Sequence, residues 1–272
     1  MAFRLLDVRL WDSQPNLALV AHNNREWVVG GHVKVPLTAS YTLASLAKVD
    51  VAPFLRFSGQ LARVSLVAET GDVGVRRLMG EDPTRRVAAV NFANARQAGG
   101  GYRVGCTAKE ERDCYATPAM IASLEAAKYP FDFWNELKYT PDLQITRDST
   151  DFYAPLPRNR WATYSVITAA APDLRPGTGD TWSAPKMERL IDGIFRAPLL
   201  CDRLPVCTLQ TGAFGSGAFV NPPELIAPLM CAAIKAFRPY YRDIVVSIPD
   251  ATSTNYRVYE QTLLAYNLIN AK

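Results

Sequence analysis

From residue 61 onward the sequence alternates short β-rich runs with longer helical runs, and this alternation limits the possible folds most. The β-rich runs predict strands at residues 61–69, 86–92, 143–147, 164–171, 205–210 and 242–249. The other runs predict helices at residues 71–80, 107–128, 183–196, 222–237 and 255–270. Pro118 marks a kink or a break in the second of these helices. Such alternation favours an α/β fold with a mostly parallel sheet between two layers of helices.

Residues 1–60 lack this alternation and contain scattered apolar runs with turn signals such as HNN and VVGGH. We interpret them as an N-terminal extension packed on a domain formed by residues 61–272. Charges at Arg4, Asp7 and Arg9 interrupt the apolar core that a secretory signal needs. No later stretch is long and apolar enough to span a bilayer. We therefore expect a soluble, intracellular protein of the cytoplasm or nucleus.

The composition argues against several kinds of site. The five cysteines form no CxxC pair, and the two histidines, His22 and His32, both lie near the N-terminus. Zinc sites need clustered sulfur and nitrogen ligands, so we expect no metal site and structural, reduced thiols. A Ser-His or Cys-His nucleophile is equally hard to build, which leaves the chemistry to carboxylates. The net charge of +4 is spread along the chain and does not indicate a nucleic-acid partner.

A first glycine-rich loop follows the predicted strand at residues 86–92. It places Gly99, Gly100 and Gly101 between the end of a strand and the start of a helix. Residues without a Cβ let backbone N–H groups approach an oxygen-rich ligand, and they adopt positive φ readily. Because ligands of α/β sheets lie beyond the carboxyl ends of the strands, we interpret the triplet as part of a ligand site. A flexible loop is the alternative interpretation.

A second glycine-rich loop, TGAFGSGAFVNPPE, covers residues 211–224 and again lies between a strand and a helix. Backbone amides that lead into a helix N-terminus suit a diphosphate. The loop lacks the GK[ST] ending of a Walker A motif. Phe214 and Phe219 are either core aromatics or, in the case of Phe219, a surface for a ribose or adenine.

Between the two loops, the sequence TAKEE carries two adjacent glutamates. Thr107 and Glu110 match the capping box, in which the carboxylate reaches back to the first N–H of the helix. We therefore expect Glu110 to stabilise the start of the helix. Neighbouring helical residues project about 100° apart, so Glu111 faces another direction and is the candidate for chemistry on a ligand.

These motifs together resemble the microbial-type poly(ADP-ribose) glycohydrolases, in which a GGG triplet precedes a QEE triplet by a short spacer. Here seven residues separate Gly101 from the Lys109-Glu110-Glu111 triplet. The segments NFANA, ITAAAPDL and TGAFGSGAFVNPP are also similar to segments of bacterial-type members. The resemblance extends over about residues 61–268.

The resemblance implies a macrodomain-like three-layer α/β/α sandwich that hydrolyses the ribose–ribose O-glycosidic bond of poly(ADP-ribose) without a metal or cofactor. It implies that Glu111 is catalytic and that Glu110 supports it. The residues expected to contact the ligand are Asn94, Gly99, Gly100, Gly101, Gly212, Phe214, Gly215, Ser216, Gly217, Ala218, Phe219 and Tyr256. Tyr256 is a candidate for stacking on adenine, with a core or surface tyrosine as the alternative. The expected partners are ADP-ribose, poly(ADP-ribose) or ADP-ribosylated proteins, and we expect a monomer.

Two residues depart from the family pattern. Lys109 replaces Gln, and Ser216 stands where bacterial members often have Cys. A cation beside Glu111 would favour its ionised form and weaken its role as a proton donor. Since a lysine in the first helical turn opposes the macrodipole, we expect Lys109 to turn toward solvent. A non-catalytic ADP-ribose reader is therefore one alternative to the glycohydrolase. A mono(ADP-ribosyl) hydrolase is another, because the sequence does not show whether the site is open beyond the proximal ribose.

Overall fold

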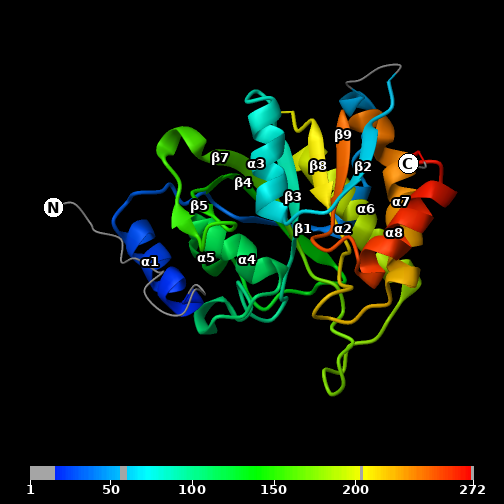
Figure 1. The fold of residues 1–272 in the computed structure, drawn as a ribbon. Helices are drawn as coiled ribbons and strands as arrows, with labels where there is room; N and C mark the ends of the chain where they lie inside the picture. The colour runs from blue at the N-terminus through cyan, green and yellow to red at the C-terminus, as the bar shows by residue number, and fades with distance from the viewer. Residues whose placement is uncertain (1–15, 56–59, 203–204, 271–272) are drawn as a thin grey trace.

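The computed structural model of the protein describes residues 16–55, 60–202 and 205–270. A seven-stranded sheet at its centre has the order β1-β4-β7-β3-β8-β9-β2 (Figure 1). Its strands are β1 (Ala39–Thr42), β2 (Arg63–Val67), β3 (Val87–Phe92), β4 (Glu136–Ile145), β7 (Ala162–Ala169), β8 (Thr208–Thr211) and β9 (Asp243–Ser247). The five strands from β7 to β2 in this order pair in parallel, while β4 is antiparallel to both of its neighbours. A separate two-stranded ribbon contains β5 (Arg147–Asp148) and β6 (Ala154–Pro155).

Helices cover both faces of the sheet and bury a hydrophobic core on each (Figure 1). One core contains side chains of α2 (Leu43–Ala47), α6 (Ala184–Cys201), α7 (Pro223–Phe237) and α8 (Thr254–Ala265). The other contains side chains of α1 (Leu17–Val29), α3 (Gly71–Glu81), α4 (Lys109–Ala116) and α5 (Pro118–Glu125). Short 3₁₀ helices are η1 (Ala52–Phe54), η2 (Tyr102–Val104), η3 (Arg158–Arg160) and η4 (Arg238–Tyr240).

Strand β3 shows why the sheet can face two cores. Ala88 and Val90 belong to the first core, whereas Val87 and Ala89 belong to the second. Successive side chains of a strand point to opposite faces, so a run of apolar residues serves both layers of helices. The expected α/β/α sandwich with a mostly parallel sheet is confirmed.

Two elements differ most from the sequence prediction. The helix predicted over 107–128 is two helices, because Thr117 leaves the helical conformation before Pro118, as residues before proline tend to do. Strand β4 starts at Glu136 rather than at residue 143. Its pairing with β7 shifts register between Thr140 and Leu143, where Asp142 has a φ of 55°, and this interruption hides the first half of the strand in the sequence.

The segment before residue 61 contributes directly to the sheet and to both helical layers, with α2 in the first core and α1 in the second. Strand β1 is the edge strand beside β4, with Ala39 opposite Tyr139. Helix α1 packs against η2, α4 and α5. Among the described residues, none of the helices combines the length and apolar character that crossing a membrane requires.

Candidate functional site

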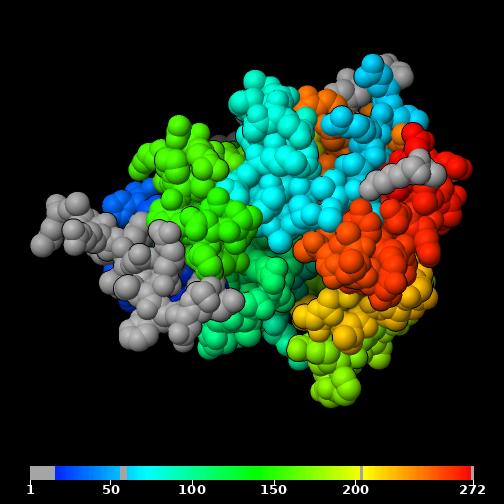
Figure 2. Space-filling view, viewed as in Figure 1, coloured from blue at the N-terminus to red at the C-terminus, as the bar shows by residue number. Residues whose placement is uncertain are grey.

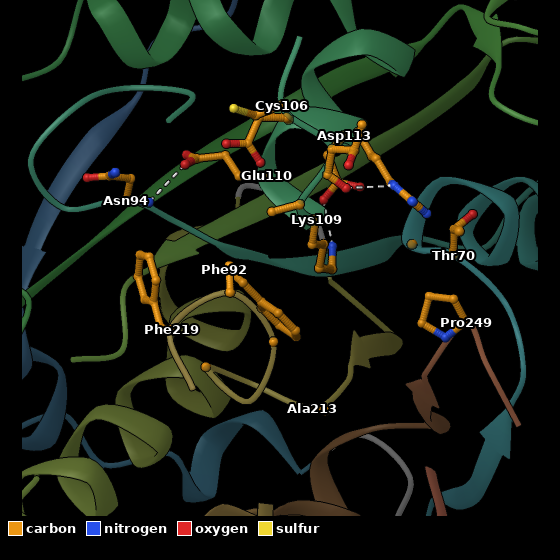
Figure 3. A pocket seen from close by; sticks show the side chains of 18 of the residues that line it. Thr70, Phe92, Asn94, Cys106, Lys109, Glu110, Asp113, Ala213, Phe219 and Pro249 are labelled. Carbon is orange, nitrogen blue, oxygen red and sulfur yellow. Dashed lines mark hydrogen bonds and ion pairs between the residues drawn. The ribbon is translucent and has the colours of Figure 1, made fainter. Parts of the chain in front are cut away.

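A cavity of about 500 Å³ lies at the carboxyl ends of β3, β8 and β9. Its wall is formed by the end of β3, the start of α4, the loop after β8 and the residues between β9 and α8 (Figure 3). Figure 2 shows the surface hollowed between the start of α4 and the residues that precede α8. This is the position at which α/β sheets bind their ligands.

Glu111 is fixed by the first glycine-rich loop. The Gly101 N–H donates to Glu111 Oε1 at 2.8 Å. A Cβ on Gly100, whose φ is 52°, would lie 2.5 Å from the same oxygen, so the loop can approach the carboxylate only with glycine at this position. Oε2 is buried and has no hydrogen-bond partner among the described residues. Glu111 therefore lines the cavity with one oxygen held and the other unengaged.

Glu110 binds the end of β3 with both oxygens. Asn91 Nδ2 donates to Oε1 at 3.1 Å, and the Asn94 N–H donates to Oε2 at 2.8 Å. The pKa of Glu110 is raised to about 8, mainly by burial and to a smaller extent by the neighbouring Glu111, against the lowering effect of these hydrogen bonds. The carboxyl group thus joins α4 to the strand that carries the first loop.

The prediction that Glu110 forms a capping box with Thr107 was wrong. Helix α4 starts at Lys109 with Ala108 as its N-cap, and no side chain caps it. The end of β3 offers Glu110 two donors from outside the helix, and these replace the local bond to the cap residue.

Lys109 was expected to turn to solvent, and this was wrong as well. It lines the cavity, and its Nζ donates to Asp113 Oδ2 at 2.6 Å (Figure 3). The ammonium also lies 5.1 Å from the centre of the Phe92 ring. Asp113 is buried one turn further along the helix, so the ion pair outweighs the effect of the macrodipole. The positive charge of Lys109 is therefore compensated inside the wall of the site.

The loop after β8 is fixed by hydrogen bonds from Asn221, and its Gly217 side is open to the cavity. Asn221 Nδ2 donates to the carbonyl oxygens of Gly215 and Pro172, at 3.0 and 2.8 Å. Within the described residues, the N–H groups of Gly217 and Ala218 donate to no backbone carbonyl. A Cβ on Gly217 would have no described atom within 4 Å. These amides remain available to an anionic group in the cavity.

The structure brings eight of the expected site residues to the cavity: Asn94, Gly101, Glu110, Glu111, Gly215, Gly217, Ala218 and Phe219. Six others are not among the residues that line it: Gly99, Gly100, Gly212, Phe214, Ser216 and Tyr256. Gly99 packs on Ile121, and Gly212 packs on the Ser247 carbonyl. Tyr256 is buried in the first core, and its neighbour Asn255 lines the cavity instead.

Several lining residues were not among the expected ones. They include Phe92, Cys106, Asp113 and Arg175. Asp113 lies four residues after Lys109, a spacing that predicts an ion pair on one face of a helix. Arg175 comes from a loop far away in the sequence and carries no comparable signal; its guanidinium lies 5.7 Å from the centre of the Phe219 ring. Within the described ranges, no group of three or more His, Cys, Asp and Glu side chains is placed to hold a metal ion.

Comparison with known proteins gives three results, from a family model, from curated proteins and from solved structures. Residues 34–148 match the family model of the catalytic domain of microbial-type PARG, poly(ADP-ribose) glycohydrolase. This confirms the resemblance inferred from the sequence and the expectation of a glycosidase-type hydrolase. A search of curated proteins found no match.

Solved structures of bacterial poly(ADP-ribose) glycohydrolases are similar to this chain over most of its length. The enzyme from Thermomonospora curvata is 22% identical, with 90% of this chain and 98% of that chain covered and a TM-score of 0.71. The enzyme from Deinococcus radiodurans in complex with ADP-ribose is 22% identical, with 84% and 94% covered and a TM-score of 0.69. These similarities confirm the macrodomain-like fold.

Proposed function

We propose, from the match of residues 34–148 to a glycohydrolase catalytic domain, that this protein binds an ADP-ribose group in the cavity and releases it from poly(ADP-ribose). The observation that carries the proposal is the geometry of Glu111, a buried carboxylate held by the Gly101 N–H with its second oxygen unengaged. The relatives support it, because the D. radiodurans enzyme was solved with ADP-ribose and the T. curvata enzyme with the inhibitor ADP-HPD.

In the proposed reaction Glu111 serves first as acid and then as base. Its carboxyl group donates a proton to the oxygen of the leaving ribose while the bond between this oxygen and the anomeric carbon breaks. The anomeric carbon then has oxocarbenium character, which the ligand's own diphosphate stabilises. A water adds its oxygen to that carbon and gives its proton to the Glu111 carboxylate. The products are ADP-ribose and a shortened polymer with a free hydroxyl group.

Glu110 and the second loop have supporting roles in this proposal. With a pKa of about 8, Glu110 is mostly protonated at neutral pH, so it joins α4 to β3 without placing a negative charge beside Glu111. The free amides of the loop after β8 bind the diphosphate, and Phe219 packs against a ring of the ligand.

The non-catalytic reader was an alternative because a free cation beside Glu111 would oppose proton donation. The ion pair between Lys109 and Asp113 removes much of that objection, since the charge is compensated within the wall. This favours hydrolysis over binding alone. The leaving group, a second ribose or a protein side chain, distinguishes the glycohydrolase from the mono(ADP-ribosyl) hydrolase.

The test is to incubate the protein with poly(ADP-ribose) and, separately, with a mono-ADP-ribosylated protein, and to quantify free ADP-ribose by chromatography. Release from the polymer is the expected result, and the Glu111→Gln protein purified in the same way gives the background. Release from the mono-ADP-ribosylated protein alone would identify the mono(ADP-ribosyl) hydrolase. Calorimetric binding of ADP-ribose without any release would identify a reader, and the lack of both would refute the proposal.

A further inference from the structure

Helix α1 lies outside the segment that matches the family model, yet one of its side chains contacts the elements that hold Glu111. Asn24 is fully buried. Its Nδ2 lies within hydrogen-bond distance of three acceptors: Tyr102 Oη at 3.0 Å, the Cys114 carbonyl at 3.2 Å and the Tyr115 carbonyl at 3.1 Å. One amide group therefore reaches both α4 and the residue that follows the glycine triplet.

The contact with α4 caps the carboxyl end of the helix. The last carbonyls of a helix have no partner within it. Because α4 ends before Pro118, its terminal carbonyls are buried against other elements: Asn24 donates to those of Cys114 and Tyr115, and the Thr146 N–H donates to that of Ala116. Helix α4 has only eight residues, so this cap lies about 12 Å or less from the end that carries Glu110 and Glu111.

The contact with Tyr102 reaches the glycine triplet. Tyr102 directly follows Gly101, whose N–H holds Glu111, and the Tyr102 N–H donates to the Gly99 carbonyl. Its own carbonyl accepts a hydrogen bond from Tyr115 Oη at 2.8 Å. Tyr102 is thus held at its hydroxyl by Asn24 and at its backbone by α4.

The other side of the Asn24 amide is anchored by Arg147. Arg147 Nε donates to Asn24 Oδ1 at 2.5 Å, and Arg147 Nη1 donates to the Tyr153 carbonyl at 3.0 Å. The guanidinium also lies 5.3 Å from the centre of the ring of Trp27, one turn further along α1. These contacts orient the amide so that its oxygen faces Arg147 and its NH₂ group faces α4 and Tyr102.

We propose that Asn24 is a positioning residue, which fixes the glycine triplet against α4 so that the Gly101 N–H and Glu111 keep their alignment. It touches no reacting atom and acts through Tyr102 and the carboxyl end of α4. The expected change in turnover rests on the proposed function, the hydrolysis of poly(ADP-ribose). Its structural consequence, the order of residues 99–106, does not depend on activity.

Asn24→Asp is the sharpest variant. The carboxylate keeps an acceptor for Arg147 but loses the NH₂ group that binds Tyr102 and α4. Asn23→Asp is the matched control, because Asn23 is also buried in α1 and its Nδ2 has no hydrogen-bond partner in the described part of the chain. Tyr102→Phe removes only the hydroxyl and leaves the pair of Asn24 and Arg147 intact, so it tests the same link if Asn24→Asp fails to fold.

The measurements are kcat and KM on poly(ADP-ribose) and the hydrogen exchange of the peptide covering residues 99–106. We expect Asn24→Asp to lower kcat about tenfold or more with KM changed much less, since a misplacement of about 1 Å can cost ~10²-fold in rate. Tyr102→Phe should show part of this loss, and the double variant should lose no more than Asn24→Asp. Exchange at 99–106 should accelerate in both single variants and stay at the wild-type rate in Asn23→Asp.

Equal kcat and equal exchange in the Asn24 and Asn23 variants would overturn the inference. A parallel loss of kcat in both would show that general weakening of α1 is responsible, and this would overturn it too. If the wild-type protein releases no ADP-ribose, the proposed function fails, and the exchange rates of residues 99–106 still decide whether Asn24 orders the loop.

Discussion

The two glycine-rich loops follow neighbouring parallel strands, β3 and β8, and each leads toward a helix, but their glycines serve different purposes. In the first loop, added Cβ atoms would meet protein side chains: Ile121 at 2.5 Å for Gly99, Glu111 at 2.5 Å for Gly100, and Cys106 at closer range for Gly101. In the second loop, Gly217 faces open space. Gly212 and Gly215 of the second loop pack on protein atoms as well, so the contrast lies between two positions. Gly100 lets the first loop approach the carboxylate of Glu111, whereas Gly217 leaves room for a ligand.

The largest effect should come from Glu111, the group that the first loop holds. Glu111→Gln keeps the shape of the side chain and removes the transferable proton, so turnover of poly(ADP-ribose) should fall by ~10² or more. Calorimetric affinity for ADP-ribose should stay within a few fold, because the second loop is unchanged. If binding and turnover fell together, the division of roles between the loops would be wrong.

The next largest effect comes from placing the same residue, tryptophan, in each of the two loops and comparing binding with stability. Gly217→Trp should weaken ADP-ribose binding by about tenfold or more, ~1.4 kcal/mol, because the indole occupies open cavity, while the melting temperature stays near that of the wild type. Gly100→Trp should lower the melting temperature instead, since its φ of 52° and the contact with Glu111 leave no room for any side chain. Equal melting temperatures for the two variants would contradict the contrast.

A smaller effect concerns the pH dependence of stability at the first loop. The pKa of Glu110 is raised from 4.5 to about 8 in the folded protein, so its contribution to the free energy of unfolding is complete below about pH 4.5 and is lost as pH rises toward 8. Glu110→Gln should cost about 1 kcal/mol near pH 5, because the amide NH₂ cannot accept one of the two hydrogen bonds. Between pH 5 and 8 its stability should fall less than that of the wild type, as measured by urea unfolding. Parallel pH profiles would show that Glu110 does not titrate in this range.

The smallest effect is expected at Lys109, which lies between the two loops. Because Asp113 already compensates its charge, Lys109→Gln should change kcat by less than about tenfold, the range of a modest perturbation of an acid–base group. Steady-state kinetics on poly(ADP-ribose) measure this. A large rise in kcat would instead show that the lysine suppresses proton donation by Glu111.

The sequence predicted the layers, six of the seven strands of the central sheet and the two loops, because β-rich runs, helical runs and glycine clusters are local signals. It gave no strand in residues 1–60, so β1 was missed. It also placed Glu111 near the glycine triplet in the candidate site, and the structure brings the two together, while the catalytic role of Glu111 stays a prediction. The contacts of Glu110 and Lys109 were predicted wrongly, because local rules for the first turn of a helix do not include partners brought close by the fold. For Glu110 these partners lie at the end of β3, and for Lys109 the partner is the buried Asp113. Asn24 had no local signal, since its acceptors lie 78 to 91 residues further along the chain.

The short strand β1 leaves the sheet with a shorter free edge than β4 would present, and we expect this to limit self-association. It covers residues Glu136–Tyr139 of the much longer β4. A chain shortened to begin at residue 61 would leave these backbone groups unpaired at the edge of the sheet. Such an edge is a template on which a second molecule can add its own strand, the first step toward aggregation. Any engineered version of the enzyme that must stay soluble at high concentration should therefore retain Ala39–Thr42.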